Sequence, residues 1–97
     1  MNVNLSIIVP LFNEQESLVE LSSWIDKVVT KNNWSYELIL IDDGSTDNSW
    51  TTIKNIQVNN SSVKGISFRR NYGKSAALNV GFETAVGNVV ITMDADL

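Results

Sequence analysis

The apolar run VVITMDADL presents two carboxylates, Asp94 and Asp96, separated by a single residue. Side chains at positions i and i+2 of a strand point to the same face, so both carboxylates could be aimed at one ion. The chain contains no histidine and no cysteine, so any bound metal must be a hard cation held by oxygen atoms. Mg²⁺ and Mn²⁺ fit a site in which one or two carboxylates are completed by substrate phosphates. The D-x-D spacing therefore predicts a divalent metal site.

A cationic cluster lies in the segment FRRNYGKSAALNVG. Arg70 and Lys74 stand at the start of a predicted helix, where free backbone N–H groups and the helix dipole favour an anion. The arginine can in addition make a bidentate contact to phosphate. The alternative interpretation is a plain turn at Asn71-Tyr72-Gly73 with solvated cations. The residue pattern leaves both interpretations open.

The segment IDDGSTD places two adjacent carboxylates, Asp42 and Asp43, after another apolar run. Adjacent carboxylates repel each other and a plain turn needs only one, so the pair indicates a contact to a nucleotide base or a ribose. The structural alternative is a turn with Gly44 at positive φ, followed by Ser45, Thr46 or Asp47 as the cap of a helix. Neither G-x-G-x-x-G nor G-x-x-x-x-G-K-[ST] occurs, so the two common glycine-based phosphate cradles are missing.

The elements that must position these side chains can be predicted from periodicity. Continuous apolar runs predict strands at residues 5–10, 36–42, 65–70 and 88–94. Apolar residues at helical spacing predict helices at residues 17–31, around 50–56 and at 73–87. The last helix is expected to place one face on the sheet with Ala77, Leu78, Phe82 and Ala85. Strands without polar alternation are buried on both faces, and intervening helices imply right-handed parallel crossovers.

The predicted fold class is therefore α/β, a layered parallel sheet with the order β-α-β-α-β-α-β. In such sheets, ligands bind beyond the carboxyl ends of the strands. Each predicted strand end carries a polar or charged cluster, at residues 10–14, 42–47, 69–74 and 94–96. The topology thus gathers every candidate residue on one rim of the sheet.

Composition narrows the class of protein further. The 97 residues allow one domain at most, and 43% apolar content argues against disorder. The net charge is −4 and no basic patch is denser than Arg69, Arg70 and Lys74, which argues against general nucleic-acid binding. The chain has no signal-peptide pattern and no apolar run near the ~20 residues that span a bilayer, so a cytoplasmic location is expected.

Four segments at natural spacing carry a family resemblance: SIIVPLFNEQESL, ELILIDDGSTDNS, RRNYGKSAALNVGFETAVG and VVITMDADL. Together they resemble the N-terminal half of inverting glycosyltransferases of family 2, which are GT-A fold enzymes that use nucleotide-diphosphate sugars. The R-N-x-G-K-x-A-A-L pattern followed by D-A-D-L is most similar to the polyprenyl-phosphate branch, which includes dolichol-phosphate mannose synthase-like enzymes. The resemblance implies that residues 1–97 form the nucleotide-sugar-binding half of one domain.

The resemblance also implies roles for the residues that match the family motifs. The implied substrate-binding residues are Pro10, Phe12, Glu14, Asp42, Asp43, Arg70, Lys74 and Asp94. The first three resemble residues that line the base and ribose pocket, and at least one member of the acidic pair would contact the base. Asp94 and Asp96 match the D-x-D motif, which positions the ribose and a diphosphate-bound Mg²⁺ or Mn²⁺.

The implied reaction is transfer of a sugar, with inversion, from a UDP- or GDP-sugar to an acceptor in cell-envelope glycan biosynthesis. A polyprenyl phosphate is one candidate acceptor. The metal would offset charge on the leaving nucleoside diphosphate, and a carboxylate base normally activates an acceptor hydroxyl. A lipid phosphate is already an anion and depends less on such a base.

The catalytic carboxylate, the acceptor-binding strands and any membrane-associating helices are expected after Leu97. The sequence is therefore expected to be an N-terminal piece with little activity of its own, and a longer protein could associate with a membrane. Its open sheet edge, along the fourth strand or the open side of the first, is expected to drive self-association. The alternative from another class is a non-enzymatic nucleotide- or metal-binding module.

Overall fold

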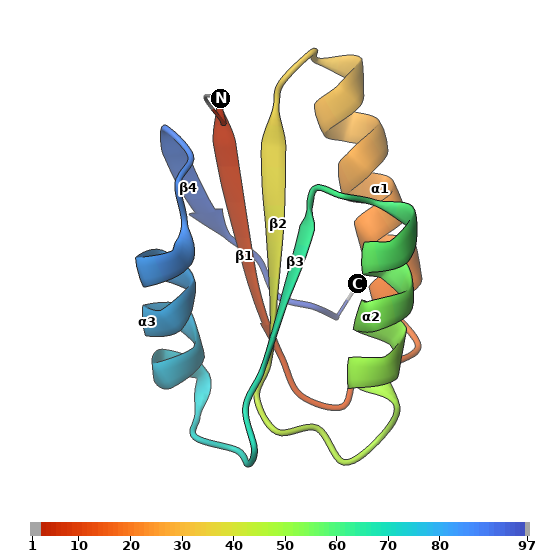
Figure 1. Cartoon of the computed structure of the whole chain (residues 1–97), viewed down its shortest axis with the longest axis vertical. Helices are drawn as coiled ribbons and strands as arrows, with labels where there is room; N and C mark the ends of the chain where they lie inside the picture. The colour runs from red at the N-terminus through yellow and green to blue at the C-terminus, as the bar shows by residue number, and fades with distance from the viewer. Residues whose placement is uncertain (1–2, 97) are drawn as a thin grey trace.

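The computed structural model describes residues 3–96, and the predicted alternation of strands and helices is confirmed in it (Figure 1). Residues 1, 2 and 97 of the predicted domain lie outside the described part. The elements are β1 (Leu5–Leu11), α1 (Leu18–Lys31), β2 (Tyr36–Asp42), α2 (Ser49–Asn59), β3 (Val63–Ser67), α3 (Lys74–Thr84) and β4 (Val89–Thr92). Within residues 3–96, no helix combines the length and the apolar character needed to cross a bilayer.

The strands form one parallel four-stranded sheet in the order β3-β2-β1-β4. Helices α1 and α2 cover one face of this sheet and α3 covers the other, as Figure 1 shows. All strands run in the same direction, so their carboxyl ends meet at one rim. The layered parallel sheet predicted from the sequence is therefore confirmed.

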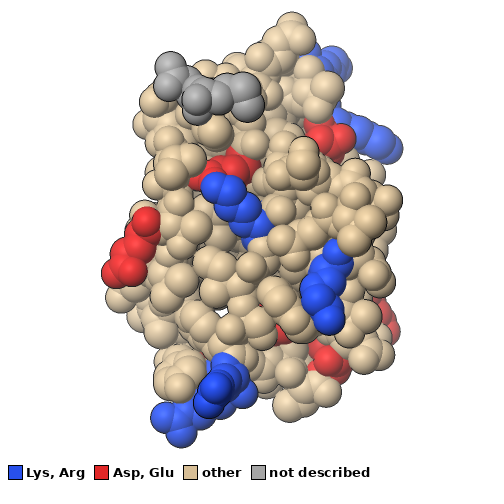
Figure 2. All heavy atoms as spheres, in the orientation of Figure 1, with Lys and Arg blue, Asp and Glu red and all other residues tan. Residues whose placement is uncertain are grey.

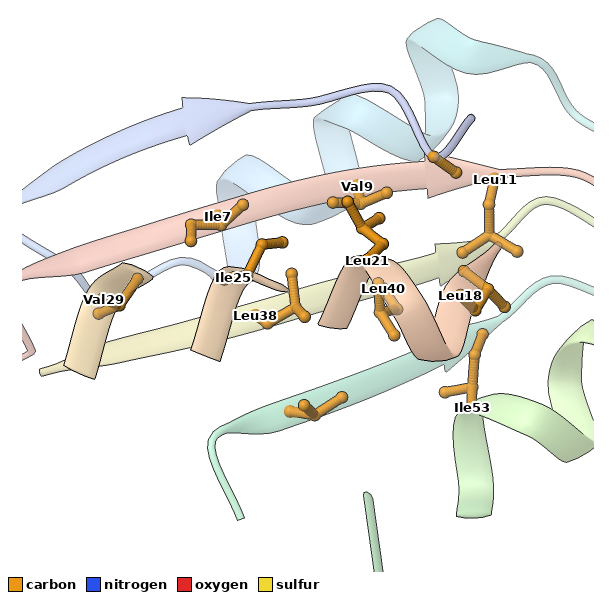
Figure 3. Packing of buried hydrophobic residues seen from close by; sticks show 12 residues of the cluster. Ile7, Val9, Leu11, Leu18, Leu21, Ile25, Val29, Leu38, Leu40 and Ile53 are labelled. Atoms are coloured by element: carbon orange, nitrogen blue, oxygen red, sulfur yellow. The ribbon is translucent and has the colours of Figure 1, made fainter. Parts of the chain in front are cut away.

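The two central strands, β1 and β2, are buried on both faces. On the α1 side, a cluster of buried aliphatic side chains fills the space between sheet and helix (Figure 3). On the other side, Ile8, Ile39 and Ile41 pack beneath α3. Gly81 permits this close approach, because a Cβ atom there would lie 2.4 Å from Ile8 Cγ2.

β3 is shifted from its predicted position. It begins at Val63 and ends at Ser67, so Arg69 and Arg70 lie beyond the strand that was predicted to include them. The reason is the length of its partner: Ser67 pairs with Asp42, the last residue of β2. One further backbone bond, from Phe68 N to Asp42 O at 2.9 Å, closes the ladder.

The prediction that all strands are buried on both faces is wrong for β4. Val89, Val90 and Ile91 are 56%, 40% and 38% exposed, because the hydrophobic clusters on the two faces of the sheet include no β4 residue. Among the described strands, β4 pairs with β1 alone and is an edge strand. β1 is paired on both sides, so the predicted open side of the first strand is also wrong. Phe82 is 52% exposed, contrary to expectation, because α3 meets the sheet through the small residues Ala77 and Gly81.

A buried polar network at the amino end of the sheet was missed by the sequence analysis. Glu37 is 2% exposed within β2, and its Oε2 accepts hydrogen bonds from Ser6 Oγ at 2.5 Å and Val86 N at 2.7 Å. Its Oε1 accepts from Lys64 Nζ at 2.5 Å. Gly87 N donates to Ser6 Oγ at 2.8 Å. The network therefore ties β1, β2 and β3 to the connection that leads into β4.

Candidate functional site

The rim at the carboxyl ends of the strands contains a cleft of about 200 Å³. Its lining residues are Pro10, Leu11, Phe12, Glu14, Asp43, Lys74, Asp94, Ala95 and Asp96. Apart from Leu11 and Ala95, all of these were predicted site residues. The structure thus brings them together from the ends of β1, β2 and β4 and the start of α3. Asp42 and Arg70, which were also predicted, do not line the cleft.

Lys74 and Asp94 face each other across the cleft. Lys74 Nζ donates to Asp94 Oδ1 at 3.1 Å, with side-chain exposures of 65% and 70%. Such an exposed ion pair is worth at most ~1 kcal/mol, so it can open at little cost when a ligand competes. The cleft therefore offers a cation and a carboxylate that are both available to a bound molecule.

The geometry of the D-x-D pair differs from the prediction. β4 ends at Thr92, so Asp94 and Asp96 lie in the following segment and not on a strand with alternating faces. Both nevertheless line the same cleft. The chain stays beside β1 as far as Met93, whose N donates to Ile8 O at 3.0 Å, and the next three residues, Asp94, Ala95 and Asp96, all line the cleft.

The two carboxylates suit a cation that arrives together with a phosphate ligand. Residues 3–96 contain no group of three or more His, Cys, Asp or Glu side chains that could hold a metal ion. Mg²⁺ and Mn²⁺ are often held by one or two carboxylates, with substrate phosphates and water completing the coordination. Asp94 and Asp96 fit this arrangement and do not form an all-protein cage.

Asp43 holds the connection between β3 and α3. Its carboxylate is buried at 5% exposure and accepts hydrogen bonds from Tyr72 N at 2.8 Å and Gly73 N at 3.0 Å. Gly44 lets the two connections approach closely: it has φ +75°, and a Cβ atom there would lie 2.2 Å from the carbonyl carbon of Arg70. Asp43 therefore sets the path of the segment that leads to Lys74.

The other acidic residue of the pair has a different environment. Asp42 is 2% exposed, and its Oδ1 accepts from Ser45 N at 2.8 Å, which closes the turn after β2. Asp43 is thus the member of the pair that faces the cleft.

Arg70 lies outside the cleft. Its guanidinium carbon is 4.9 Å from the centre of the Tyr72 ring, in a cation–π contact. Figure 2 shows Lys and Arg side chains gathered at the lower end of the molecule, where Figure 1 places the β3–α3 connection. Arg70, which was predicted to contact the nucleotide, is not among the residues that line the cleft, so this contact stays a prediction.

The predicted capping of α2 by Ser45 or Thr46 is wrong. The N-cap position is Asn48, and no side-chain cap hydrogen bond is present there. Asp47 instead accepts from Ser49 N and Ser49 Oγ, at 2.9 and 2.6 Å. Burial raises the pKa of the Asp47 carboxyl, but hydrogen bonds from Ser49 and from Gln15 N outweigh this, and the pKa is lowered. Asp47 is therefore a charged structural acceptor at the start of α2.

A second, acidic hollow adjoins the cleft at the start of α1. It is lined by Asn13, Glu14, Gln15, Glu16, Ser17, Glu20, Asp47 and Asp96. Glu14 and Asp96 line both the hollow and the cleft.

Comparison with known proteins places this geometry in a family. Residues 6–97 match the family model described as glycosyl transferase family 2. The chain belongs to glycosyltransferase family 2. The family predicted from the sequence motifs is therefore confirmed.

Curated members of family 2 resemble the chain over nearly its whole length. It is 45% identical over 93 residues to the undecaprenyl-phosphate 4-deoxy-4-formamido-L-arabinose transferase of Aeromonas hydrophila, covering 95% of this chain and 28% of the relative. The protein of the same name from Pseudomonas fluorescens is also 45% identical over 93 residues, with 95% and 27% covered. The chain thus spans about 28% of the length of the curated relatives that it matches.

Two solved structures share the fold of the chain. The mannosyltransferase PcManGT from Pyrobaculum calidifontis, in complex with GDP-Man and Mn²⁺, has a TM-score of 0.82 at 23% identity, over 99% of this chain and 28% of that one. S. aureus TarS 1–349 in complex with UDP has a TM-score of 0.79 at 28% identity, over 97% and 28%. The predicted GT-A glycosyltransferase fold class is confirmed.

Proposed function

We propose that this chain binds the nucleoside diphosphate of a UDP- or GDP-sugar and forms the donor half-site of an inverting glycosyltransferase. The observation that carries this proposal is the cleft, which joins the D-x-D carboxylates to Lys74 and to Asp43 in a family 2 fold. In this proposal, residues 1–97 are the nucleotide-sugar-binding half of a GT-A domain. Family membership and the transferase names of the relatives favour an enzyme over a non-enzymatic binding module.

Each side of the cleft has a proposed role. Pro10, Phe12 and Glu14 border the base and ribose on the β1 side, and Lys74 neutralises diphosphate oxygens at the start of α3. Asp94 and Asp96 would hold Mg²⁺ or Mn²⁺, which when bound offsets charge on the leaving diphosphate. Solved structures of two similar proteins contain Mn²⁺, which supports this choice of metal. Among residues 3–96, no side chain is assigned as the catalytic base.

For the acceptor, we propose a polyprenyl phosphate. The support comes from the two 45% identical relatives, whose names specify undecaprenyl phosphate. A phosphate acceptor is already anionic at neutral pH, so its attack depends less on deprotonation by a protein base. A lipid acceptor would also bring the longer protein to a membrane surface.

Replacing both Asp94 and Asp96 with alanine is expected to abolish metal-dependent nucleotide binding, because both cation ligands are lost. The measurement is calorimetric titration of the chain with UDP and with GDP, each with and without Mn²⁺. The matched control is the Glu16→Ala, Glu20→Ala double variant, which removes the same charge from the adjoining hollow. Equal affinity of wild type and the Asp94, Asp96 variant in Mn²⁺ would contradict the proposal. No binding of either nucleotide to wild type would overturn it.

We further propose that the chain self-associates along the exposed edge of β4. This strand carries no charged residue, and an uncharged, apolar edge strand is a template for pairing with another chain. Light scattering is expected to give an average mass above that of the monomer, and Ile91→Lys is expected to lower it. Val58→Lys, at an 84% exposed position on α2, is the control. A wild-type chain that remains monomeric would contradict this expectation.

A further inference from the structure

Asn13 joins the connection between β1 and α1 to the connection between β2 and α2. Its Oδ1 accepts hydrogen bonds from Thr46 N at 2.8 Å and from Asp47 N at 3.2 Å. Its Nδ2 donates to Thr46 Oγ1 at 3.2 Å, and its backbone N–H donates to Ser45 Oγ at 2.8 Å. A single side chain thus satisfies two backbone donors of a neighbouring connection.

The residues that follow Asn13 continue the same contact. Glu14 N donates to Ser49 Oγ at 3.0 Å, and Gln15 Oε1 accepts from Asn48 N at 2.8 Å. These bonds occupy the start of α2, which has no side-chain cap of its own. The two connections therefore form one hydrogen-bonded unit beside the cleft.

The backbone at Asn13 is in the left-handed region, with φ 54°. Only glycine enters this region freely, and asparagine is the side chain that tolerates it best. Asn33, at the end of α1, shares this conformation with φ 58°. Its backbone N–H donates to Thr30 O at 3.0 Å, at the amino end of the sheet and far from the cleft. Within residues 3–96, two asparagines are therefore left-handed, and one of them borders the site.

Asn13 lies between Phe12 and Glu14, and both of these residues line the cleft. We propose that Asn13 is a positioning residue, which fixes the β1–α1 connection on the β2–α2 connection and so holds Phe12 and Glu14 in place for a bound nucleotide. This inference rests on the proposed function. It assigns a role to a residue that the sequence motifs did not single out and that does not line the cleft itself.

The test compares Asn13→Gly with Asn33→Gly. Glycine keeps the positive φ at both positions, so only the side-chain bonds are removed. Affinity for UDP and GDP with Mn²⁺ is measured by calorimetry well below the melting temperature, and amide exchange is followed at Thr46 and Asp47. For Asn13→Gly we expect roughly tenfold weaker binding and faster exchange of both amides. Asn33→Gly should leave both the nucleotide affinity and the exchange of these two amides unchanged.

Asn13→Asp keeps the Oδ1 acceptor and is expected to recover most of the affinity, which a general loss of stability would not predict. Wild-type affinity in Asn13→Gly would overturn the positioning role, even if amide exchange were faster. If Asn13→Gly does not fold, Asn13→Asp alone serves as the test. In that variant, normal exchange protection of the Thr46 and Asp47 amides together with tenfold weaker nucleotide binding would overturn the positioning role. Absence of nucleotide binding by wild type would overturn the proposed function, and the positioning role with it.

Discussion

Replacing Asp43 with alanine is expected to abolish detectable nucleotide binding and to lower the free energy of unfolding by roughly 2–4 kcal/mol. The carboxylate is buried and accepts hydrogen bonds from two backbone N–H groups, of Tyr72 and Gly73. Alanine would leave both donors without this acceptor, and each unsatisfied buried group costs about 1–3 kcal/mol. The released connection would also carry Lys74 away from the cleft. Calorimetry and urea denaturation measure the two effects.

Asp42→Ala is the matched control, because it removes the adjacent buried carboxylate. Asp42 binds one backbone N–H, that of Ser45, and does not line the cleft. A smaller loss of stability and retained binding are therefore expected. If Asp42→Ala lost binding while Asp43→Ala kept it, the assignment of Asp43 as the cleft-facing carboxylate would be wrong.

Replacing Glu37 with alanine is expected to lower the free energy of unfolding by roughly 2–4 kcal/mol, because each buried donor left without an acceptor costs about 1–3 kcal/mol. The Val86 N–H and the Ser6 hydroxyl would lose their acceptor, and Lys64 would lose its ion pair. The α3–β4 connection would then be held less firmly on the sheet. Glu37→Gln keeps the shape and one acceptor oxygen, so its loss should be smaller. A destabilisation below about 1 kcal/mol in Glu37→Ala would contradict this account.

The same carboxylate predicts a pH dependence of stability. Burial raises the pKa of Glu37, but hydrogen bonds from Lys64, Ser6 Oγ and Val86 N outweigh it, and the pKa is lowered from its ordinary value of 4.5. Because the pKa is lower in the folded state, the contribution of Glu37 to stability is complete above the pKa of the unfolded state. This contribution is lost as the pH falls through the pKa of the folded state. Denaturation of wild type should therefore become easier below about pH 4.5, and Glu37→Gln should flatten this part of the curve. If wild type and Glu37→Gln lost stability equally as the pH falls, the predicted role of Glu37 in the pH dependence would be wrong.

The central part of the fold could be predicted because its physical cause is local. β1 and β2 are buried on both faces, so their sequences are continuous apolar runs. The bounds of β3 could not be predicted in the same way, since they depend on where β2 ends. Glu37 also escaped attention within the apolar run YELILID, because its partners come from three other segments.

That most of the predicted site residues lie together could be predicted from topology, since parallel strands bring all their carboxyl ends to one rim. The details of the site did not follow. Which of Asp42 and Asp43 faces the cleft depends on how the chain leaves β2, and two adjacent acids give no signal of this. Ser45 and Thr46 resemble helix caps in sequence, yet they bind Asn13 from a connection 32 and 33 residues away. Long-range contacts of this kind leave no local pattern.

The most direct test of the central account is to locate Mn²⁺ on the chain in the presence of a nucleotide. Paramagnetic Mn²⁺ broadens the backbone amide signals of residues near it, and a chain of 97 residues is well suited to such spectra. With UDP or GDP present, the account predicts broadening centred on Leu11, Asp43 and Ala95 around the cleft. Broadening centred instead on Glu16 and Glu20 of the acidic hollow, or broadening that does not depend on nucleotide, would contradict it.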